Sequence, residues 1–453
     1  MKMLFIEFNI DSTIGINQGL ISLSSVLKAN DVDVDLLLIS DFVDTPFNLD
    51  HIKEHILKTK PDIIGISLIE TQLKFVKLFC EDAKNYFNGK IICGGPYASM
   101  APDDTINMKG VDVVCIGEGE EALVSLLSDI NKTDINNLWF KCGGSIIKNK
   151  LKPFRDIKNL PPPDYELYNL NTLIPLKNNQ LEVMAGRGCM YKCTYCINTP
   201  YIDRYKKDCS GLKTKEYVRF LDVDTTINNI KQLKNRYNFK ELAFIDDSFL
   251  TYHNFLDEFC YKYKKEIGLP FVCNANPLSL TDDKAKKLKD AGCDTIRFGI
   301  ESGNERIRRE ILCRPMNNGV IINVFNITKR YNIKTSSYNM IGLPTETKEE
   351  VLDTLKLNAI IRPNFIKLMT FYPFKNTPIY DTCNDMGLIN VRKKESLNNY
   401  NTTSCLKFVK EHIMFLEDVQ LNFEKYINDY MTNSKYKYNK YANVSLAKLE
   451  IEK

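Results

Sequence analysis

The sequence predicts an α/β protein with an open Rossmann-like parallel sheet, a partial (β/α)6 barrel after it, and a small helical C-terminal region. Short runs of valine, isoleucine and leucine alternate with stretches of helical spacing, first up to about residue 140 and again from about residue 179. A passage with several prolines separates the two series. Because strands connected by helices run parallel, each series indicates one domain, and 453 residues suffice for two or three domains.

The first domain is predicted over residues 1–140. Its five expected strands are Met3–Phe8, Val34–Ile39, Asp62–Ser67, Lys90–Cys93 and Asp112–Ile116. Ligands of such sheets bind beyond the carboxyl ends of the strands, where this sequence has Gly94-Gly95-Pro96-Tyr97 and Gly117-Glu118-Gly119. Glycine lets a backbone approach a bulky ligand or phosphate closely. For either motif alone, a tight connection between strand and helix is the commoner explanation.

Residues 141–178 are predicted to be a semi-rigid linker, because they contain Pro153 and a run of three prolines at 161–163. The barrel is predicted over residues 179–380, with chemistry at the carboxyl ends of its strands. Its six expected strands are Leu181–Ala185, Glu241–Ile245, Pro270–Ala275, Asp294–Ile300, Lys334–Ile341 and Phe365–Phe371. Residues 381–453 are predicted to form the helical C-terminal region.

The first barrel strand leads into a loop with three cysteines, Cys189, Cys193 and Cys196. A structural zinc site needs four ligands, and neither a fourth cysteine nor a histidine lies at a suitable spacing nearby. Three thiolates suit a [4Fe-4S] cluster that leaves one iron open, whereas an electron-transfer ferredoxin normally supplies all four ligands. The loop therefore predicts chemistry at an iron–sulfur cluster. Three buried thiols brought together by chance are the alternative.

The C-x3-C-x2-C spacing, with Tyr195 before the last cysteine, resembles the cluster loop of radical S-adenosylmethionine (SAM) enzymes. The two glycine motifs ahead of it resemble the cobalamin-binding domain fused to many of these enzymes. The resemblance covers nearly all of residues 1–380 and implies three cofactors: the [4Fe-4S] cluster, SAM and cobalamin. The loop after the first strand lacks the cobalt-binding histidine of some relatives. The residues expected around cobalamin are Asp11, Ser12, Thr13, Ser67, Gly94, Gly95, Pro96, Tyr97, Gly117, Glu118 and Gly119.

The resemblance also assigns SAM-binding roles to residues at the barrel strand ends. Asp246 and Asp247 are expected at the SAM amino group, and Glu301 with Ser302 at the ribose. Arg314 is expected to pair with the SAM carboxylate or with a neighbouring glutamate. The other residues assigned to SAM are Tyr195, Asn274, Asn276 and Gly342. No catalytic side chain is singled out.

Composition limits the partners. Lys+Arg 61 against Asp+Glu 57 gives a net charge of only +4, which indicates neither a nucleic-acid partner nor an anionic membrane. No apolar run is long enough to span a membrane. The 14 cysteines of a chain without a secretory start favour the reducing cytoplasm.

The resemblance implies a cobalamin-dependent methyltransferase that acts on an unactivated centre of a small-molecule or peptide substrate, with a flavodoxin or ferredoxin as reductant. In such relatives SAM yields a 5′-deoxyadenosyl radical, and methylcobalamin supplies the methyl group. Two alternatives stay open. The barrel could catalyse a rearrangement, cyclisation or oxidation without methyl transfer, or the chain could be an iron–sulfur electron-transfer or scaffold protein.

Overall fold

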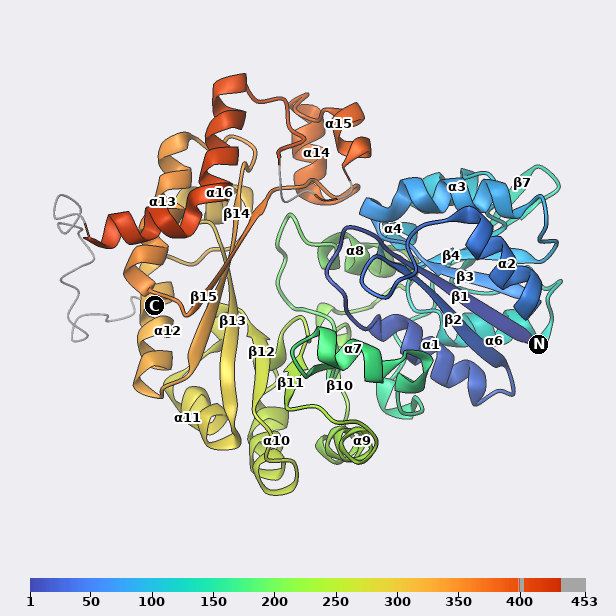
Figure 1. The fold of residues 1–453 in the computed structure, drawn as a ribbon, viewed down its shortest axis with the longest axis horizontal. Helices are drawn as coiled ribbons and strands as arrows, with labels where there is room; N and C mark the ends of the chain where they lie inside the picture. The colour runs from blue at the N-terminus through green and yellow to red at the C-terminus, as the bar shows by residue number, and fades with distance from the viewer. Residues whose placement is uncertain (398, 400–402, 433–453) are drawn as a thin grey trace.

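The computed structural model describes residues 1–397, 399 and 403–432 of the chain (Figure 1). An N-terminal α/β domain lies beside a curved parallel sheet covered by helices. The last C-terminal helix packs at the edge of that sheet, and the two helices before it lie toward the N-terminal domain. The predicted fold class is therefore confirmed.

The N-terminal sheet has the strand order β2-β1-β3-β4-β5-β6-β7, with the first five of these strands parallel. Its strands are β1 (Lys2–Asn9), β2 (Asp33–Ser40), β3 (Ile63–Ser67), β4 (Lys90–Gly94), β5 (Val113–Cys115), β6 (Leu138–Cys142) and β7 (Ser145–Lys148). Its helices are α1 (Gln18–Lys28), α2 (Leu49–Thr59), α3 (Leu73–Ala83), α4 (Gly95–Met100), α5 (Pro102–Asn107) and α6 (Glu120–Ser128).

Both faces of this sheet are buried, which explains the continuous apolar runs of its strands. On β1, Met3 and Phe5 pack in the cluster that contains residues of α1 and α6. Leu4 and Ile6 point to the opposite face and pack with residues of α2 and α3. All five strands predicted from the sequence are present at nearly the predicted positions.

A hairpin extends this sheet beyond the predicted boundary at residue 140. β6 pairs antiparallel with β5 and with β7, and the turn is made by Gly143 and Gly144, both with positive φ. Residues 141–148 thus belong to the sheet and not to the linker. The rest of the linker contains one α-helix, α7 (Leu170–Leu176), which the sequence reasoning did not predict.

The barrel sheet has six parallel strands in the order β15-β14-β13-β12-β11-β8. Its strands are β8 (Gln180–Val183), β11 (Glu241–Phe244), β12 (Phe271–Ala275), β13 (Cys293–Glu301), β14 (Lys334–Ile341) and β15 (Phe365–Thr370). A two-residue pair, β9 (Gly186–Arg187) with β10 (Arg219–Phe220), follows β8. The helices are α8 (Asn198–Asp208), α9 (Val223–Arg236), α10 (His253–Glu266), α11 (Asp282–Ala291), α12 (Asn318–Arg330) and α13 (Lys348–Ile361).

The C-terminal region contains α14 (Pro378–Asp385), α15 (Val391–Ser396) and α16 (Lys410–Thr432). The predicted boundary at residue 380 falls inside α14. Helix α16 covers α13 and β15, with Leu416, Val419 and Phe423 in one apolar cluster with Val351. Residues 433–453 of the predicted helical region lie outside the described residues. Within the described part of the chain, no helix is both long and apolar enough to cross a membrane.

Candidate functional site

A cavity of about 330 Å³ lies between the N-terminal domain and the barrel. Its deep end is apolar, with Met3, Phe5 and Ile92 from the sheet and leucines from α1 and α6. Its mouth is polar and is shared by the ends of β3, β4 and β5 and by the segment that starts the cysteine loop, including Arg187 and Gly188. The carboxyl ends of the two sheets therefore meet at one cavity.

Several of the residues predicted around cobalamin line this cavity. They are Ser67, Gly94, Gly95, Pro96, Gly117, Glu118 and Gly119. Gly95 and Gly117 have φ of 86° and 78°, a region that L side chains rarely adopt. A Cβ on Gly95 would lie 2.9 Å from the Leu68 nitrogen, and one on Gly117 would lie 2.2 Å from the Tyr205 hydroxyl. Only glycine therefore fits at these two turns.

The other predicted residues lie elsewhere. Asp11, Ser12 and Thr13 are outside the described wall of the cavity, and the Asp11 amide instead donates to Asp41. Tyr97 is not among the residues that line the cavity, and its hydroxyl donates to Asp104 of α5 at 3.2 Å. Gln18 and Gly19 of α1 line the wall, which the sequence reasoning missed.

The three cysteines lie in the loop between β9 and α8, with Cys193 buried and Cys189 and Cys196 partly exposed. Burial raises the pKa of Cys189 to about 11 and that of Cys196 to about 12. The described residues contain no three cysteine, histidine or acidic side chains that converge as around a single metal ion. A cubane cluster binds each cysteine through a different iron, so its thiols need not converge on one point. Three free thiols on one loop therefore fit a cluster.

Hydrogen bonds hold this loop just ahead of its first cysteine and again between its second and third cysteines. The Asp246 carboxylate, fully buried after β11, accepts from the amides of Ala185 (3.0 Å) and Gly186 (2.6 Å) just ahead of the loop. Burial raises the pKa of Asp246 to about 7. Within the loop, the Thr194 amide donates to the Leu312 carbonyl. Asp246 thus supports the loop backbone, and its expected contact with the SAM amino group stays a prediction.

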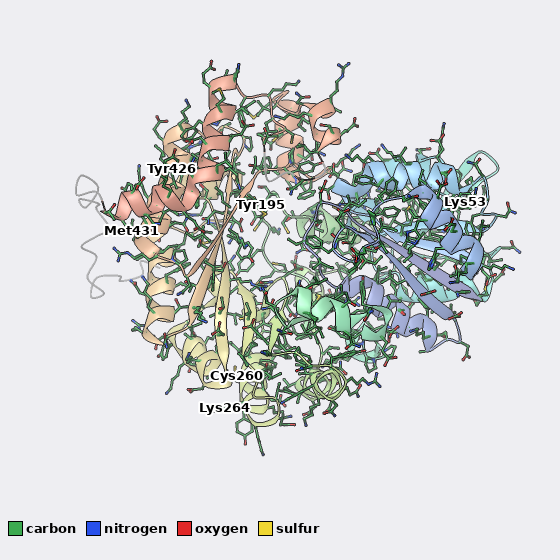
Figure 2. All side chains as sticks on the ribbon, viewed as in Figure 1. Lys53, Tyr195, Cys260, Lys264, Tyr426 and Met431 are labelled. Atoms are coloured by element: carbon green, nitrogen blue, oxygen red, sulfur yellow. The ribbon has the colours of Figure 1, made fainter. Side chains whose placement is uncertain are left out.

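Arg314 joins the cysteine loop to the end of β13. Its Nη1 lies 3.4 Å from Cys193 Sγ and 3.4 Å from the Tyr195 hydroxyl, and its Nη2 donates to the Gly299 carbonyl at 2.6 Å. Figure 2 shows Tyr195 between the barrel sheet and the N-terminal domain. Burial raises the pKa of Glu301, while Arg314 and a hydrogen bond from Tyr195 oppose that rise. The structure therefore brings Tyr195, Glu301 and Arg314 together beside Cys193.

Three buried side-chain atoms at the strand ends have no hydrogen-bond partner among the described residues. They are Nε of Arg314, Oγ of Ser248, which follows Asp246 and Asp247, and Oε1 of Glu346, which follows β14. A buried polar atom without a partner costs free energy unless a ligand or water satisfies it. An unpaired guanidinium nitrogen next to the cysteine loop fits the carboxylate of SAM.

The remaining residues assigned to SAM lie along the same edge. Asp247 lines the cavity and accepts from Asn198 at 3.1 Å. Asn274 donates to the Asp246 carbonyl. Asn276 caps a 3-10 turn, and Ser302 accepts from the Asn304 amide, so both have structural roles in this structure. The Gly342 amide donates to Glu346, and Gly342 packs against Leu416 of α16.

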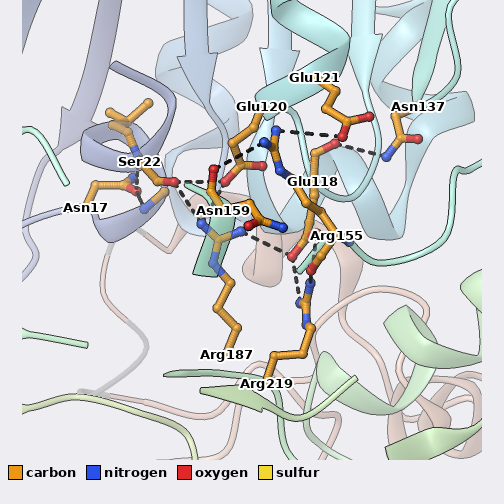
Figure 3. Close-up of polar contacts among 12 residues, drawn as sticks. Asn17, Ser22, Glu118, Glu120, Glu121, Asn137, Arg155, Asn159, Arg187 and Arg219 are labelled. Carbon is orange, nitrogen blue, oxygen red and sulfur yellow. Dashed lines mark hydrogen bonds and ion pairs between the residues drawn. The ribbon is translucent and has the colours of Figure 1, made fainter. Parts of the chain in front are cut away.

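Arginines from the barrel side bind acidic residues of the N-terminal domain at the cavity mouth (Figure 3). Arg187 donates to Glu118 (3.1 Å), Glu120 (2.7 Å) and Ser22 (2.8 Å). Arg219 donates to both carboxylate oxygens of Glu118, at 2.7 and 3.0 Å. We call this set, Ser22, Glu118, Glu120, Arg187 and Arg219, the arginine junction. The sequence drew attention to Glu118 in the Gly117-Glu118-Gly119 motif and to Arg187 just before the first cysteine, but it did not predict that they pair.

Comparison with known families identifies both domains. Residues 183–357 match the radical SAM superfamily, and residues 12–127 match the B12 binding domain. The chain is a radical SAM protein with a B12 binding domain. A radical SAM protein of this kind is an enzyme that uses a [4Fe-4S] cluster and SAM, and its B12 domain uses cobalamin, so the three predicted cofactors are confirmed.

Individual relatives are distant. The chain is 24% identical to an uncharacterized methyltransferase of Pyrococcus horikoshii over 82% of this chain and 78% of that protein. The fold resembles that of the radical SAM methyltransferase TsrM of Kitasatospora setae, with a TM-score of 0.68 and 13% identity over 85% of this chain and 76% of that one. It also resembles the cobalamin-dependent SAM radical enzyme OxsB, with a TM-score of 0.71 and 17% identity over 95% and 70%.

Proposed function

We propose that this radical SAM enzyme is a cobalamin-dependent methyltransferase that methylates an unactivated centre of a small-molecule or peptide substrate. The observation that carries the proposal is the shared cavity, in which the glycine turns of the B12 domain face the start of the cysteine loop. An enzyme that only rearranged or oxidised its substrate would not need a second cofactor at that position. The P. horikoshii relative and TsrM, both described as methyltransferases, support the same reaction.

The cofactors supply the radical chemistry and the methyl carrier when they are bound. The chain positions them. Cys189, Cys193 and Cys196 would hold the cluster, and Arg314 and Asp247 would hold the carboxylate and amino group of SAM. The apolar recess behind Gly94 and Gly95 would take part of the corrinoid, which exceeds the cavity volume, while the polar mouth would meet its amide-bearing edge. Closure of the site between two domains would also exclude water from the reacting atoms.

The decisive experiment follows the methyl group. With SAM deuterated in its methyl group, anaerobic turnover on the true substrate should place the label in the product, and S-adenosylhomocysteine and 5′-deoxyadenosine should form together. Accumulation of 5′-deoxyadenosine and product without transfer of the label would reject methyl transfer in favour of rearrangement, cyclisation or oxidation. Absence of SAM cleavage under reduction would indicate an electron-transfer or scaffold protein.

The ligand assignment has its own test. Replacement of Cys189, Cys193 and Cys196 together with alanine should abolish the iron and sulfide content of anaerobically reconstituted protein. Cys313 is a matched control, since it is an exposed thiol next to Arg314 but outside the loop. Cys313→Ala should keep its full iron and sulfide content, and equal loss in both variants would refute the assignment.

The proposal also places the enzyme in the cytoplasm, with a small electron-transfer protein as its reductant. All 14 cysteines are free thiols in the structure, which suits the reducing cytoplasm. A flavodoxin or ferredoxin would reduce the cluster. A net charge of +4 on 453 residues gives no reason to expect a nucleic-acid substrate.

A further inference from the structure

We propose that Arg187 is a positioning residue that fixes the start of the cysteine loop against the Gly117–Glu121 turn of the B12 domain. The cofactors of the two domains would then sit at a set separation. This inference rests on the proposed function only where it concerns turnover. The contacts that Arg187 makes are formed by the chain alone and do not depend on the reaction.

Arg187 occupies the place where such a tie acts most directly. It lies two residues before Cys189, in the short strand β9, while Glu118 and Glu120 flank Gly119 at the end of β5 and the start of α6. Its guanidinium reaches across the domain boundary, with Nη1 on Glu118 and Nη2 on both Glu120 and Ser22. Ser22 Oγ also donates to Glu120 at 2.9 Å, so the carboxylate is held from two sides.

The contacts are protected from solvent and reinforced. The Glu120 side chain is 6% exposed and that of Glu118 is 14% exposed, so their charges interact more strongly than surface charges would. Arg219 of β10, which pairs with β9, holds Glu118 through two further hydrogen bonds. The Tyr205 hydroxyl and the Asn137 side chain bind the backbone of Glu118. The Gly117–Glu121 turn therefore cannot move relative to β9 and β10 without breaking several of these hydrogen bonds at once.

A direct cofactor-binding role explains Arg187 less well. Nη1 donates to Glu118, and Nη2 donates to both Glu120 and Ser22, so three of the five N–H donors of the guanidinium already bind protein oxygens. Two carboxylates and a hydroxyl saturate its charge within the protein. The geometry thus points to a residue that acts through the two loops it connects.

The consequence for turnover follows from distance. Two reacting groups held on separate domains lose rate steeply when their separation changes, by about 100-fold for a displacement of 1 Å. Loss of the Arg187 contacts should leave each cofactor bound to its own domain. It should uncouple the formation of 5′-deoxyadenosine from methyl transfer.

The first arm of the test uses the full chain without cofactors. Hydrogen–deuterium exchange of peptides covering residues 117–121 and 186–188 is compared in wild type, Arg187→Met, Glu120→Gln, the double variant and Arg155→Gln. Arg155 is the matched control, since its backbone contacts Glu118 and Arg219, whereas its side chain binds, among the described residues, Glu121 and the Asn159 carbonyl.

We expect exchange in both peptides to rise about tenfold or more in Arg187→Met, through local opening, and to stay unchanged in Arg155→Gln. The double variant should be no worse than Arg187→Met, because the two residues act as one pair. Unchanged exchange in Arg187→Met, or an equal rise in Arg155→Gln, would overturn the proposal. If Arg187→Met does not fold, Arg187→Lys and Glu120→Gln carry the same measurement.

The second arm uses reconstituted enzyme. Arg187→Met should bind hydroxocobalamin and SAM within about threefold of wild type, while the ratio of 5′-deoxyadenosine to methylated product rises about tenfold or more. A parallel fall of both products at an unchanged ratio would show a merely structural role and reject the proposal. If the wild type transfers no methyl group, the proposed function fails, and the exchange arm still decides whether Arg187 ties the two loops.

Discussion

Two polar junctions of different character each join the N-terminal domain to a later part of the chain. The arginine junction lies at the cofactor cavity and is made by guanidinium groups that each bind two or more protein oxygens. The second, which we call the lysine junction, consists of Lys375, Lys394, Glu70 and Asp104. It joins the loop after β15 and helix α15 to the region of α3–α5.

The lysine junction consists of ammonium–carboxylate pairs and of contacts between an ammonium group and the faces of aromatic rings. Lys394 pairs with Glu70, and both side chains are 9% exposed. Its Nζ lies 4.6 Å from the centre of the Tyr372 ring and 5.5 Å from that of Tyr380. An ammonium group tolerates rotation about its partner, whereas a guanidinium fork fixes direction as well as distance. We infer that the arginine junction sets the orientation of the cofactor loops and that the lysine junction mainly holds the domains together.

The largest effect is expected from Glu118→Gln, which removes the carboxylate that both arginines share. Burial raises the pKa of Glu118, but Arg219 and Arg187 outweigh it and hold that pKa below its usual value. Loss of the charge leaves Arg219 buried without its counter-ion, which should cost about 3–5 kcal/mol in the first cooperative unfolding transition in urea. Glu118→Asp keeps the charge and should lose less. Equal losses in both variants would contradict the role assigned to charge.

Among the described residues, no cation pairs with the Glu7 carboxyl. The pH dependence of stability that Glu7 confers should therefore have the opposite sign to that of Glu118. It accepts from the Tyr168 hydroxyl of the linker, and burial raises its pKa from 4.5 to about 7. The folded state then retains a proton that the unfolded state loses, so stability falls as pH rises from about 4.5 to about 7, by up to about 3 kcal/mol.

Glu7→Gln keeps an acceptor for Tyr168 and should remove this part of the decline, so that the variant gains on wild type at pH 8 but not at pH 4. Urea unfolding at both pH values measures the difference. Asp246 and Glu346, whose pKa values burial raises to about 7 and about 8, contribute the same slope to both proteins. A constant difference across the range would show that Glu7 does not titrate as described.

The sequence predicted the repeating parts of this molecule well and the junctions hardly at all. Strands such as β1 and β14 carry apolar runs that any parallel sheet imposes, and the glycine and cysteine motifs are local in sequence. The hairpin β6–β7 was missed because Gly143-Gly144 separates strands of only five and four residues. Within the arginine junction, Ser22 and Glu120 lie about 165 and 70 residues from Arg187 in the sequence, and no periodicity records such a pairing. Asp246 was recognised as a site residue, but its role in holding the loop backbone depends on its burial.

Lys394→Met should have a smaller effect than Glu118→Gln. Methionine retains an apolar stem against Tyr372 and Tyr380, and Glu70 keeps the hydrogen bond from the Lys375 amide at 2.8 Å. We expect a loss of about 2 kcal/mol in urea unfolding and no change in the ratio of 5′-deoxyadenosine to methylated product. A changed ratio would mean that the lysine junction also sets the orientation of the cofactor loops.

The smallest effect is expected for the ion pair between Lys152 and Glu121, which lies next to the arginine junction but faces solvent. Its side chains are 57% and 44% exposed, so water and salt screen the charges. Lys152→Met should change the free energy of unfolding by about 0.5 kcal/mol or less, and 0.5 M NaCl should abolish even that difference. The same salt concentration should leave most of the Glu118→Gln effect in place, because Glu118 and Arg219 are 14% and 12% exposed. If Lys152→Met destabilised the protein as much as Glu118→Gln does, the number of charges near the boundary, and not their burial and bidentate geometry, would determine the strength of the junction.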